Sequence, residues 1–358
     1  MLRWTFRILS GLIVLAAFVL VGALGYRAWR QQETARALAI ATPNGIDEKS
    51  FVRLNGLDQW VTIRGEDRRN PVLLVISGGP GNTLVPLEAL FRPWEKHFTV
   101  VQWDQRGAGR TLESNGTTGQ GAMTLDQFTS DGVKLAEFLR FHLHKNRIVL
   151  LGASFGTVVG VRMAKARPEY FSAYVGTAQV VSSAEQEVID YAAVLKKVRA
   201  ANDADSVRAL TRVGPPPYRS LDDILVERGI ASRYDTEAER DFYPRAVQLV
   251  LFSPDTTLLD IYYMLRYGSF AARALIGEVE RYDARKLGPD FGMPVFVFNG
   301  DHDVITPFAL SRAWVGGLHA PQKAFVMLKG GGHNAMLTMP DVFLRELVAR
   351  VRPLAIKD

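Results

Sequence analysis

The chain has 358 residues, of which 47% are hydrophobic and 22% are charged, a composition typical of globular rather than disordered or fibrous proteins. It contains no cysteine, which excludes disulfide bonds, a cysteine nucleophile, thiolate zinc sites and cysteine-ligated iron–sulfur clusters. The net charge of +6 lies mostly in residues 1–36, which hold five arginines and one glutamate, and the nearly neutral remainder argues against a nucleic-acid partner.

An apolar segment near the N-terminus, residues 8–26, has 19 residues without a charge and lies between Arg7 and Arg27. As a helix it would be about 28 Å long, close to the thickness of the hydrocarbon core of a bilayer. Tyr26 and Trp29 stand at its end, where interfacial aromatic residues are common. We therefore expect residues 1–30 to be a transmembrane anchor.

Two alternatives for this segment stay open. A cleaved signal peptide would have an unusually long apolar core here, and the nearest small-residue cleavage pattern, Ala23-Leu24-Gly25, is imperfect. A buried core helix would not need the cationic and aromatic flanks. Arginines on both sides of the span do not set its orientation, but a single N-terminal anchor more often exports the domain that it carries. We expect the catalytic domain outside the cytoplasm.

The residues after the anchor show a polar tether and then alternating strands and helices. Residues 31–50 are the expected tether, and Asn55-Gly56 is expected to join a hairpin of residues 51–54 and 59–64. Buried strands are expected at residues 71–76, 98–103, 147–151, 170–177, 294–298 and 323–328. Helices are expected at residues 88–97, 125–142, 157–166, 308–315 and 341–351, the second behind a capping box from Thr124 to Gln127.

This alternation predicts an α/β fold with a mainly parallel sheet and helices on both faces. The core is expected to comprise residues 51–180 and 290–358. Residues 181–289 are helical and polar in pattern and are interrupted by Pro215-Pro216-Pro217. We interpret them as a helical lid inserted after the sixth strand, over the carboxyl edge of the sheet, where open parallel sheets bind ligands.

The strongest motif is Gly152-Ala153-Ser154-Phe155-Gly156, between a predicted strand and a predicted helix. A turn this sharp needs small residues around the serine, whose hydroxyl is then exposed at the top of the sheet as a nucleophile. A glycine-rich turn with an incidental serine is the alternative, and the strand–helix context argues against it. Ser154 is therefore the predicted nucleophile.

A serine nucleophile needs a base and a third group that orients the base, and in this architecture they follow in the order serine, acid, histidine. His333 is the predicted base because it stands in a glycine loop directly after a strand, with His302 and His319 as alternatives. Asp303 and Asp301 compete for the role of acid. We favour Asp303, which lies further into its loop, and expect Asp301 to cap or hydrogen-bond that loop.

The loop Ser77-Gly78-Gly79-Pro80-Gly81 follows the first buried strand, and its glycines let backbone N–H groups approach a substrate closely. An oxyanion hole of this type takes one N–H from such a loop and one from the residue after the nucleophile. We assign these donors to Gly79 and Phe155, with Gly78 in a supporting role.

With these motifs the chain resembles the prolyl-iminopeptidase-like α/β-hydrolases, a family of serine peptidases, over residues 50–355. The family's motifs correspond to the glycine loop above, to Asp104-Gln105-Arg106-Gly107-Ala108-Gly109-Arg110-Thr111 and to the serine motif. Ser77 replaces a histidine of the family pattern, and Phe155 replaces a tryptophan. The resemblance implies the α/β-hydrolase fold, a serine peptidase activity and Asp303 as the acid.

The resemblance also implies that carboxylates of the lid hold the free amino terminus of a substrate. Glu185 and Glu187, with Asp190 behind them, follow the sixth strand and are the candidates, with an exposed helix face as the alternative. Asp104 and Arg106 follow the strand at residues 98–103. We expect them to form an ion pair that braces the oxyanion loop.

The sequence thus predicts a membrane-anchored serine hydrolase that cleaves a small peptide, amide or ester through an acyl-enzyme, most closely an aminopeptidase of the prolyl-iminopeptidase type. A carboxylesterase or acyltransferase on the same fold and a catalytically silent binding protein are the alternatives. We expect no metal and no organic cofactor. The expected partners are a small-molecule or short-peptide substrate and the membrane, and the sequence does not predict the oligomeric state.

Overall fold

The structure is a computed structural model that describes residues 2–356, so residues 1, 357 and 358 of the expected terminal segments lie outside the described part. One sheet of eight strands forms its centre, in the order β1-β2-β4-β3-β5-β6-β7-β8. The strands are β1 (Ile46–Leu54), β2 (Leu57–Gly65), β3 (Val72–Ile76), β4 (Thr99–Trp103), β5 (Ile148–Ala153), β6 (Phe171–Thr177), β7 (Val295–Gly300) and β8 (Lys323–Leu328). The strands from β4 to β8 in this order pair in parallel, which confirms the predicted α/β fold.

The helices cover both faces of the sheet because the buried strands are apolar on both sides. In β3, Leu74 and Ile76 join one hydrophobic cluster, and Leu73 and Val75 join the other. The first cluster includes side chains of α4 (Leu125–His142), α5 (Phe155–Ala166) and α12 (Phe308–Gly317). The second includes side chains of α2 (Glu88–Phe91), α13 (Ala335–Thr338), α14 (Pro340–Glu346) and the π-helical turn Leu347–Val351, which α15 (Arg352–Ala355) follows.

The hairpin forms at Asn55-Gly56, where both residues have positive φ, 45° and 84°, as a tight hairpin turn requires. The tether in the structure is shorter than the predicted residues 31–50. Helix α1 (Leu2–Leu38) continues into it, and β1 begins at Ile46, so only residues 39–45 are irregular. Both ends are held by burial, since Leu38 and Ile46 are each buried in the body. The polar residues on either side, such as those at 31–36 and 47–50, led the sequence analysis to extend the tether too far.

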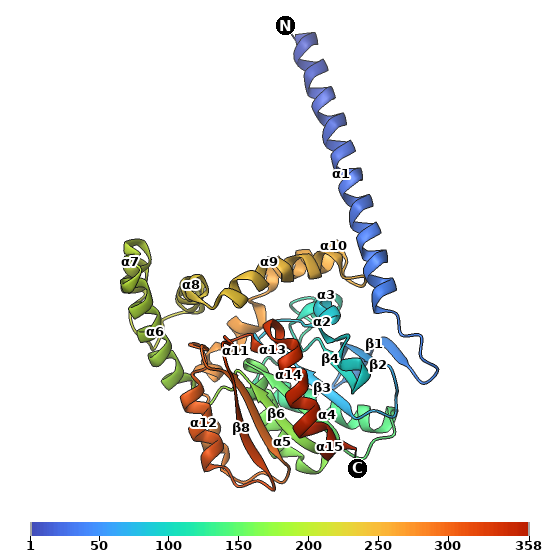
Figure 1. Cartoon of the computed structure of the whole chain (residues 1–358). Coiled ribbons are helices and arrows are strands. Elements are labelled where there is room, and N and C mark those ends of the chain that lie inside the picture. Colours follow the sequence, from blue (N-terminus) through green and yellow to red (C-terminus); the bar gives the residue numbers. More distant parts are fainter. Residues whose placement is uncertain (1, 357–358) are drawn as a thin grey trace.

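Six helices lie between β6 and β7 in the chain, and we call them the inserted helices. They are α6 (Ser183–Ala200), α7 (Ala204–Val213), α8 (Leu221–Ala231), α9 (Glu237–Phe252), α10 (Leu258–Tyr267) and α11 (Phe270–Glu280). Most of them extend across one side of the body, above the sheet in Figure 1. Helices α6, α7 and α8 share a small hydrophobic cluster of their own around Val194 and Leu210. Outside the inserted helices, the short helix α3 (Gly109–Asn115) follows β4.

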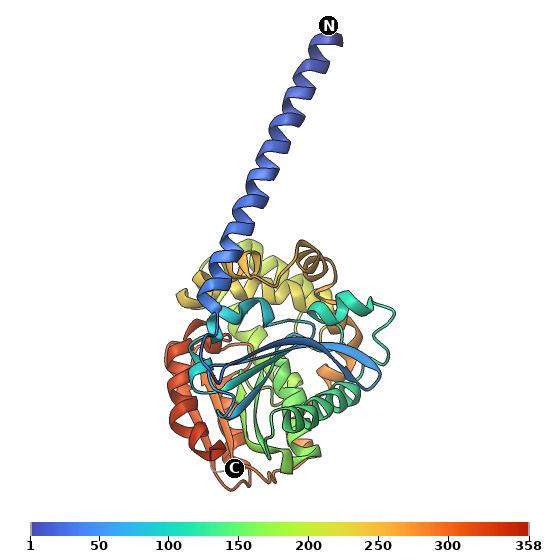
Figure 2. The same cartoon turned by 90° about the vertical axis from the view of Figure 1, so that its right-hand side faces the viewer.

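Helix α1 rises away from the body, and only its last turns lie against other elements (Figures 1 and 2). The segment Thr5–Leu38 has a mean hydropathy of 2.6 in its most apolar window, and none of that window is buried. The alternative of a buried core helix is therefore wrong. A helix of this kind anchors a protein in a membrane or serves as a signal sequence.

Candidate active site

Ser154 stands on the sharp turn between β5 and α5, with φ 52° and ψ −121°, a conformation that costs energy for any residue with a side chain. The neighbouring glycines make the turn possible. A Cβ atom on Gly156 would lie 2.2 Å from the carbonyl oxygen of Ile76, and one on Gly152 would lie 2.6 Å from that of Gly156. The turn therefore holds the serine at the carboxyl edge of the sheet.

Two further side chains reach Ser154 from the loops after β7 and β8. The distance from Ser154 Oγ to His333 Nε2 is 3.0 Å, and that from His333 Nδ1 to Asp303 Oδ1 is also 3.0 Å. The Asp303 carboxylate is buried and accepts hydrogen bonds from the backbone N–H of Thr306, at 2.9 Å, and from its hydroxyl. This is the arrangement of a nucleophile, a base and a group that orients the base.

The charge of Asp303 also affects the protonation of His333. Burial of the imidazole lowers its pKa, but the charge and hydrogen bond of Asp303 outweigh burial, with a smaller contribution from Glu239. The pKa of His333 is therefore raised above its ordinary value. An imidazole in this state accepts a proton readily and holds it as imidazolium beside the carboxylate.

The rival acid and histidines lie elsewhere. Asp301 accepts a hydrogen bond from the backbone N–H of Gly330, at 2.7 Å, and so holds the glycine loop that carries His333. His302 is 61% exposed, and the exposed His319 contacts Asp290 at 2.9 Å. The structure thus brings together the favoured residues, and it gives Asp301 the loop-holding contact expected of it.

The glycine loop packs against the nucleophile. A Cβ atom on Gly78 would lie 3.2 Å from Ser154 Cβ, so the loop passes as closely as a glycine allows. Gly79 and Phe155 both line the cavity that contains Ser154 and His333, as the assigned oxyanion donors must. Gln105, which the sequence analysis did not single out, holds the base of the loop through Ser77, whose oxygens lie 3.0 and 3.2 Å from its Nε2.

The expected ion pair between Asp104 and Arg106 is wrong. The guanidinium of Arg106 pairs with the buried Asp131 on α4, at 2.9 Å. Asp104 instead accepts hydrogen bonds from the hydroxyl of Thr83 and from the backbone N–H of Arg110. Burial raises the pKa of Asp104 to about 6, despite these hydrogen bonds. Asp104 thus holds Thr83, which lies two residues after the oxyanion loop.

Glu239 of α9 is a site residue that the sequence analysis missed. Its buried carboxylate accepts hydrogen bonds from the backbone N–H and from the side-chain amide of Asn334, both at 2.7 Å. Burial raises its pKa, and the two Asn334 hydrogen bonds oppose that rise. Because Asn334 follows His333 directly, an inserted helix helps to hold the histidine loop. No local pattern around Glu239 indicates this contact.

A cavity of about 710 Å³ lies above Ser154, between the sheet and the inserted helices. Much of its helical side is apolar, with Val188, Leu221, Ile224 and Ile276 among its residues. Glu187 and Arg228 add charges, and Tyr218 adds a buried hydroxyl. Among the described residues, no group of three or more histidines and acids is arranged to hold a metal ion.

Two charged residues of the cavity wall, Glu187 and Arg228, belong to a cluster of one guanidinium and three carboxylates. Arg228 contacts Glu187 at 2.6 Å and also pairs with Asp190 and Glu227. Burial, with the like charges of Glu227 and Glu187, raises the pKa of Asp190 to about 8, although Arg228 opposes the rise. Glu185 lies outside the cluster, since it is exposed and pairs with Arg285. Of the two predicted substrate-binding glutamates, only Glu187 lines the cavity.

Comparisons with known proteins give a consistent result. A family model described as the alpha/beta hydrolase fold matches residues 71–340. A Bacillus subtilis protein named "Probable aminopeptidase YbaC" is 28% identical over 303 residues, which cover 82% of this chain and 93% of that protein.

Two solved structures share the fold. A proline iminopeptidase-related protein of Thermus thermophilus superposes with a TM-score of 0.61 at 18% identity, covering 87% of this chain and 98% of its own. The proline iminopeptidase of Mycobacterium smegmatis gives a TM-score of 0.59 at 19% identity, covering 87% of this chain and 99% of its own. At these identities the superpositions establish the arrangement of strands and helices and nothing finer.

Proposed function

Because this chain belongs to the α/β-hydrolase fold family, we propose that it is a serine hydrolase with Ser154 as its nucleophile. The observation that carries the proposal is the continuous chain of hydrogen bonds from Ser154 through His333 to Asp303, at the floor of a large cavity. A fold alone does not imply an activity, so the proposal rests on these residues rather than on the fold.

In the proposed reaction, Ser154 Oγ attacks the carbonyl carbon of the substrate while His333 Nε2 takes the hydroxyl proton. Asp303 accepts a hydrogen bond from Nδ1–H and stabilises the imidazolium. The N–H groups of Gly79 and Phe155 bind the oxyanion of the tetrahedral intermediate. His333 then gives its proton to the leaving group, the acyl-enzyme forms, and water repeats the sequence to release the acid and restore the serine.

For the substrate, we infer an aminopeptidase that binds a free amino terminus in the cavity. Glu187 lines the cavity beside Arg228, and its carboxylate is the one in this cluster that a substrate could reach. A substrate ammonium would therefore meet negative charge, while the apolar wall would take its side chain. The names of the Bacillus subtilis relative and of the Mycobacterium smegmatis structure agree with this activity.

A carboxylesterase is the second candidate, and one contact favours it. Arg228 pairs with all three carboxylates of the cluster, which leaves less charge for a substrate ammonium. An ester with an apolar acyl group would then use the apolar wall alone.

The deciding experiment compares aminoacyl-arylamides with their N-acetylated forms, which release the same arylamine, and with short-chain acyl esters of a phenol. The aminopeptidase proposal predicts that N-acetylation removes most of kcat/KM, and that Glu187→Gln raises KM for the free amine roughly tenfold by removing a charge-assisted hydrogen bond. Glu185→Gln, outside the cavity, is the matched control and should leave KM unchanged. Equal rates on free and acetylated substrates would establish the esterase instead.

We also propose that α1 is an uncleaved anchor, that the inserted helices form a lid over the active site, and that the catalytic domain lies outside the cytoplasm. The apolar core of α1 is longer than that of an ordinary signal peptide. Full-length protein should stay in the membrane through a carbonate wash, and mass spectrometry should find its N-terminus intact. A mature chain that starts near Tyr26 would establish a cleaved signal.

A further inference from the structure

Helix α10 carries an apolar face that no other part of the described chain covers. Leu258, Leu259, Tyr262 and Leu265 are all at least half exposed, and Leu265 is 84% exposed. Leu258, Tyr262 and Leu265 follow one another at intervals of four and three residues and so share one side of the helix, with Leu259 at the edge of that side. Among the residues of α10, all described, this side carries Arg266 and no acidic group, since Asp260 is buried in the body.

The position of α10 relative to α1 is fixed by a set of contacts at the point where the apolar span ends. Arg27, the first charged residue after the span, donates a hydrogen bond to the carbonyl oxygen of Thr256. Gln31 donates to the same oxygen at 3.0 Å and to that of Ser253 at 2.7 Å. Thr256 stands two residues before α10. The start of α10 therefore lies at the level where α1 leaves the apolar span.

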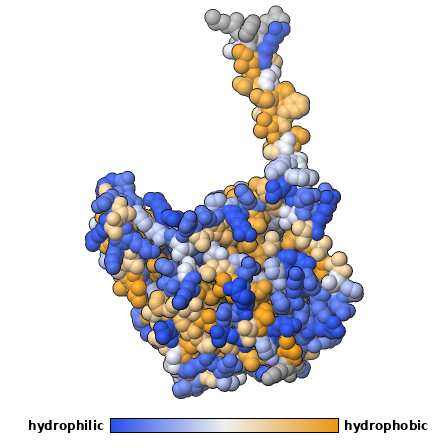
Figure 3. All heavy atoms as spheres, in the orientation of Figure 1, coloured by the Kyte–Doolittle hydropathy of each residue, from blue (hydrophilic) through white to orange (hydrophobic). Residues whose placement is uncertain are grey.

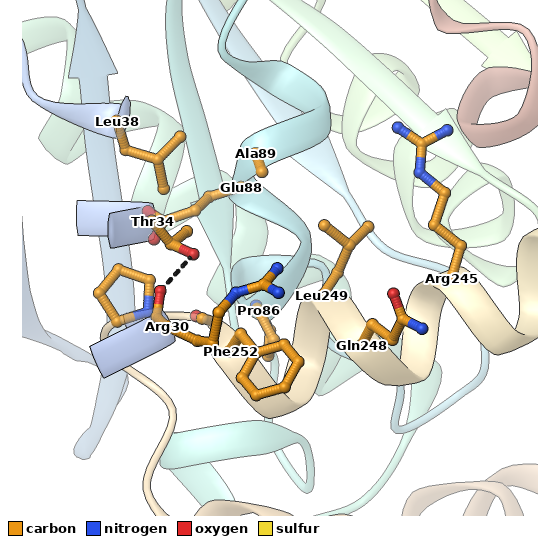
Figure 4. A pocket seen from close by; sticks show the side chains of 12 residues that line it. Arg30, Thr34, Leu38, Pro86, Glu88, Ala89, Arg245, Gln248, Leu249 and Phe252 are labelled. Carbon is orange, nitrogen blue, oxygen red and sulfur yellow. Dashed lines mark hydrogen bonds between the residues drawn. The ribbon is translucent and has the colours of Figure 1, made fainter. Parts of the chain in front are cut away.

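Aromatic contacts make the same junction rigid. Tyr26 packs edge-on against Phe252 of α9 with ring centres 5.8 Å apart, and the guanidinium of Arg30 lies 4.8 Å from the centre of the same ring. Figure 4 shows Arg30 beside Phe252, with Leu249 of α9 on the wall of the pocket between α1 and α9. Figures 1 and 2 agree that α9 and α10 lie on the side of the body from which α1 rises.

We propose that the apolar face of α10 lies in the surface of the same bilayer that α1 spans. This inference rests on the proposed anchor. The composition of the face, leucine and tyrosine with an arginine at its edge, is that of helices that lie in the membrane interface. Figure 3 shows hydrophobic residues at the surface of the body beside the base of α1. An exposed apolar patch of this kind in water would be an aggregation hazard, and a bilayer surface removes it.

The opposite side of α10 faces the active site. Met264, next to Leu265 in the chain, lines a second hollow of about 320 Å³ that also contains Ser154 and His333, and Gly268 at the end of α10 lines both hollows. One short helix thus separates the proposed membrane surface from the nucleophile. Substrates that partition into the interface are therefore expected to reach the site past α10.

The absence of cysteine allows a direct test with a single label. The full-length Leu265→Cys protein, labelled with a nitrobenzoxadiazole fluorophore, is reconstituted in phosphatidylcholine–phosphatidylglycerol vesicles with or without nitroxide lipids. Phe141→Cys is the matched control, because Phe141 is 75% exposed on α4, a helix that Figure 1 shows low on the body, away from α1 and α10. Tyr262→Cys gives a second label on the face of α10.

The inference predicts that nitroxide lipids quench most of the fluorescence at positions 262 and 265 and almost none at position 141. Equal quenching at all three positions, or no quenching at 262 and 265 in protein that resists a carbonate wash, contradicts the inference and leaves the anchor in place. Labels at 262 and 265 that are shielded from water but not quenched would mean that a second copy covers the face, which also contradicts it. Release of the protein by carbonate would contradict both the anchor and the inference.

Discussion

Two regions meet at the cavity, and they place their residues by different means. The carboxyl edge of the sheet supplies Ser154, Asp303 and His333 from the ends of β5, β7 and β8. The inserted helices supply Glu239 and Arg228 through packing against that edge. Parallel strands necessarily end at one edge, so their loops converge, whereas the helices reach the site only through the whole tertiary fold. We infer that residues at the carboxyl edge of the sheet carry out the reaction. The inserted helices would then position the His333 loop and select the substrate.

The largest expected effect on kcat comes from a substitution at the carboxyl edge of the sheet. Ser154→Ala removes the proposed nucleophile and should lower kcat on the order of 10⁶-fold, because a nucleophilic serine and its histidine act as one unit. Ser183→Ala is the control, since Ser183 lines the same cavity from α6. Steady-state kinetics of both variants check the prediction. A similar loss of kcat in the two variants would mean that a change in the cavity, and not removal of the Ser154 hydroxyl, lowers the rate.

The second effect separates the two aspartates of the β7 loop. Asp303→Asn presents the wrong partner to His333 and should cost on the order of 10⁴ in kcat. Asp301→Asn only weakens the contact with Gly330 and should cost far less. If kcat falls more in the Asp301 variant, the acid has been assigned to the wrong residue.

The third effect tests what the inserted helices add. Glu239→Gln replaces one of the two acceptors for Asn334 by a donor, which displaces the His333 loop, and a displacement of ~1 Å costs about 10² in rate. The exposed Glu237, in the same first turn of α9, gives the control variant Glu237→Gln. A positioning role requires that kcat falls while KM changes little. An unchanged kcat would confine the helices to substrate selection.

The smallest effect is a shift in pH dependence. The base must be neutral to accept the serine proton, so activity is lost as the pH falls through the pKa of His333. That pKa is raised, because the charge of Asp303 outweighs burial, and the acid limb of kcat/KM should lie above the ordinary histidine value of about 6.5. Asp303→Asn should move the limb to lower pH, and Glu239→Gln should move it less in the same direction. A limb that stays fixed in the Asp303 variant would contradict the assigned contact.

The same contrast explains what the sequence could predict. Continuous apolar runs indicate buried strands, Asn-Gly indicates a hairpin, and a serine motif between strand and helix indicates a nucleophile, because each signal is local. The order of motifs then led to Asp303 and His333, which the structure brings to Ser154. These parts of the fold and site could be predicted without any knowledge of tertiary packing.

The predicted side-chain contacts were wrong where a side chain pairs with a residue far away in the sequence. Arg106 pairs with Asp131 on α4 rather than with its neighbour Asp104. Glu185 and Glu187 lie on the same helix, yet they pair with two different arginines. Glu239 contacts a loop far away in the chain. Spacing along the sequence carries no signal for such contacts. The same holds for α1, whose end is fixed by the burial of Leu38.

The central claim, that Ser154 is a nucleophile driven by His333, is tested most directly by covalent trapping. Full-length protein is treated with a fluorophosphonate probe, digested and analysed by mass spectrometry. We predict one adduct, on the peptide that contains Ser154, and a greatly slowed reaction in the His333→Ala variant. An adduct on another residue, or no adduct in protein that hydrolyses its substrate, would contradict the account.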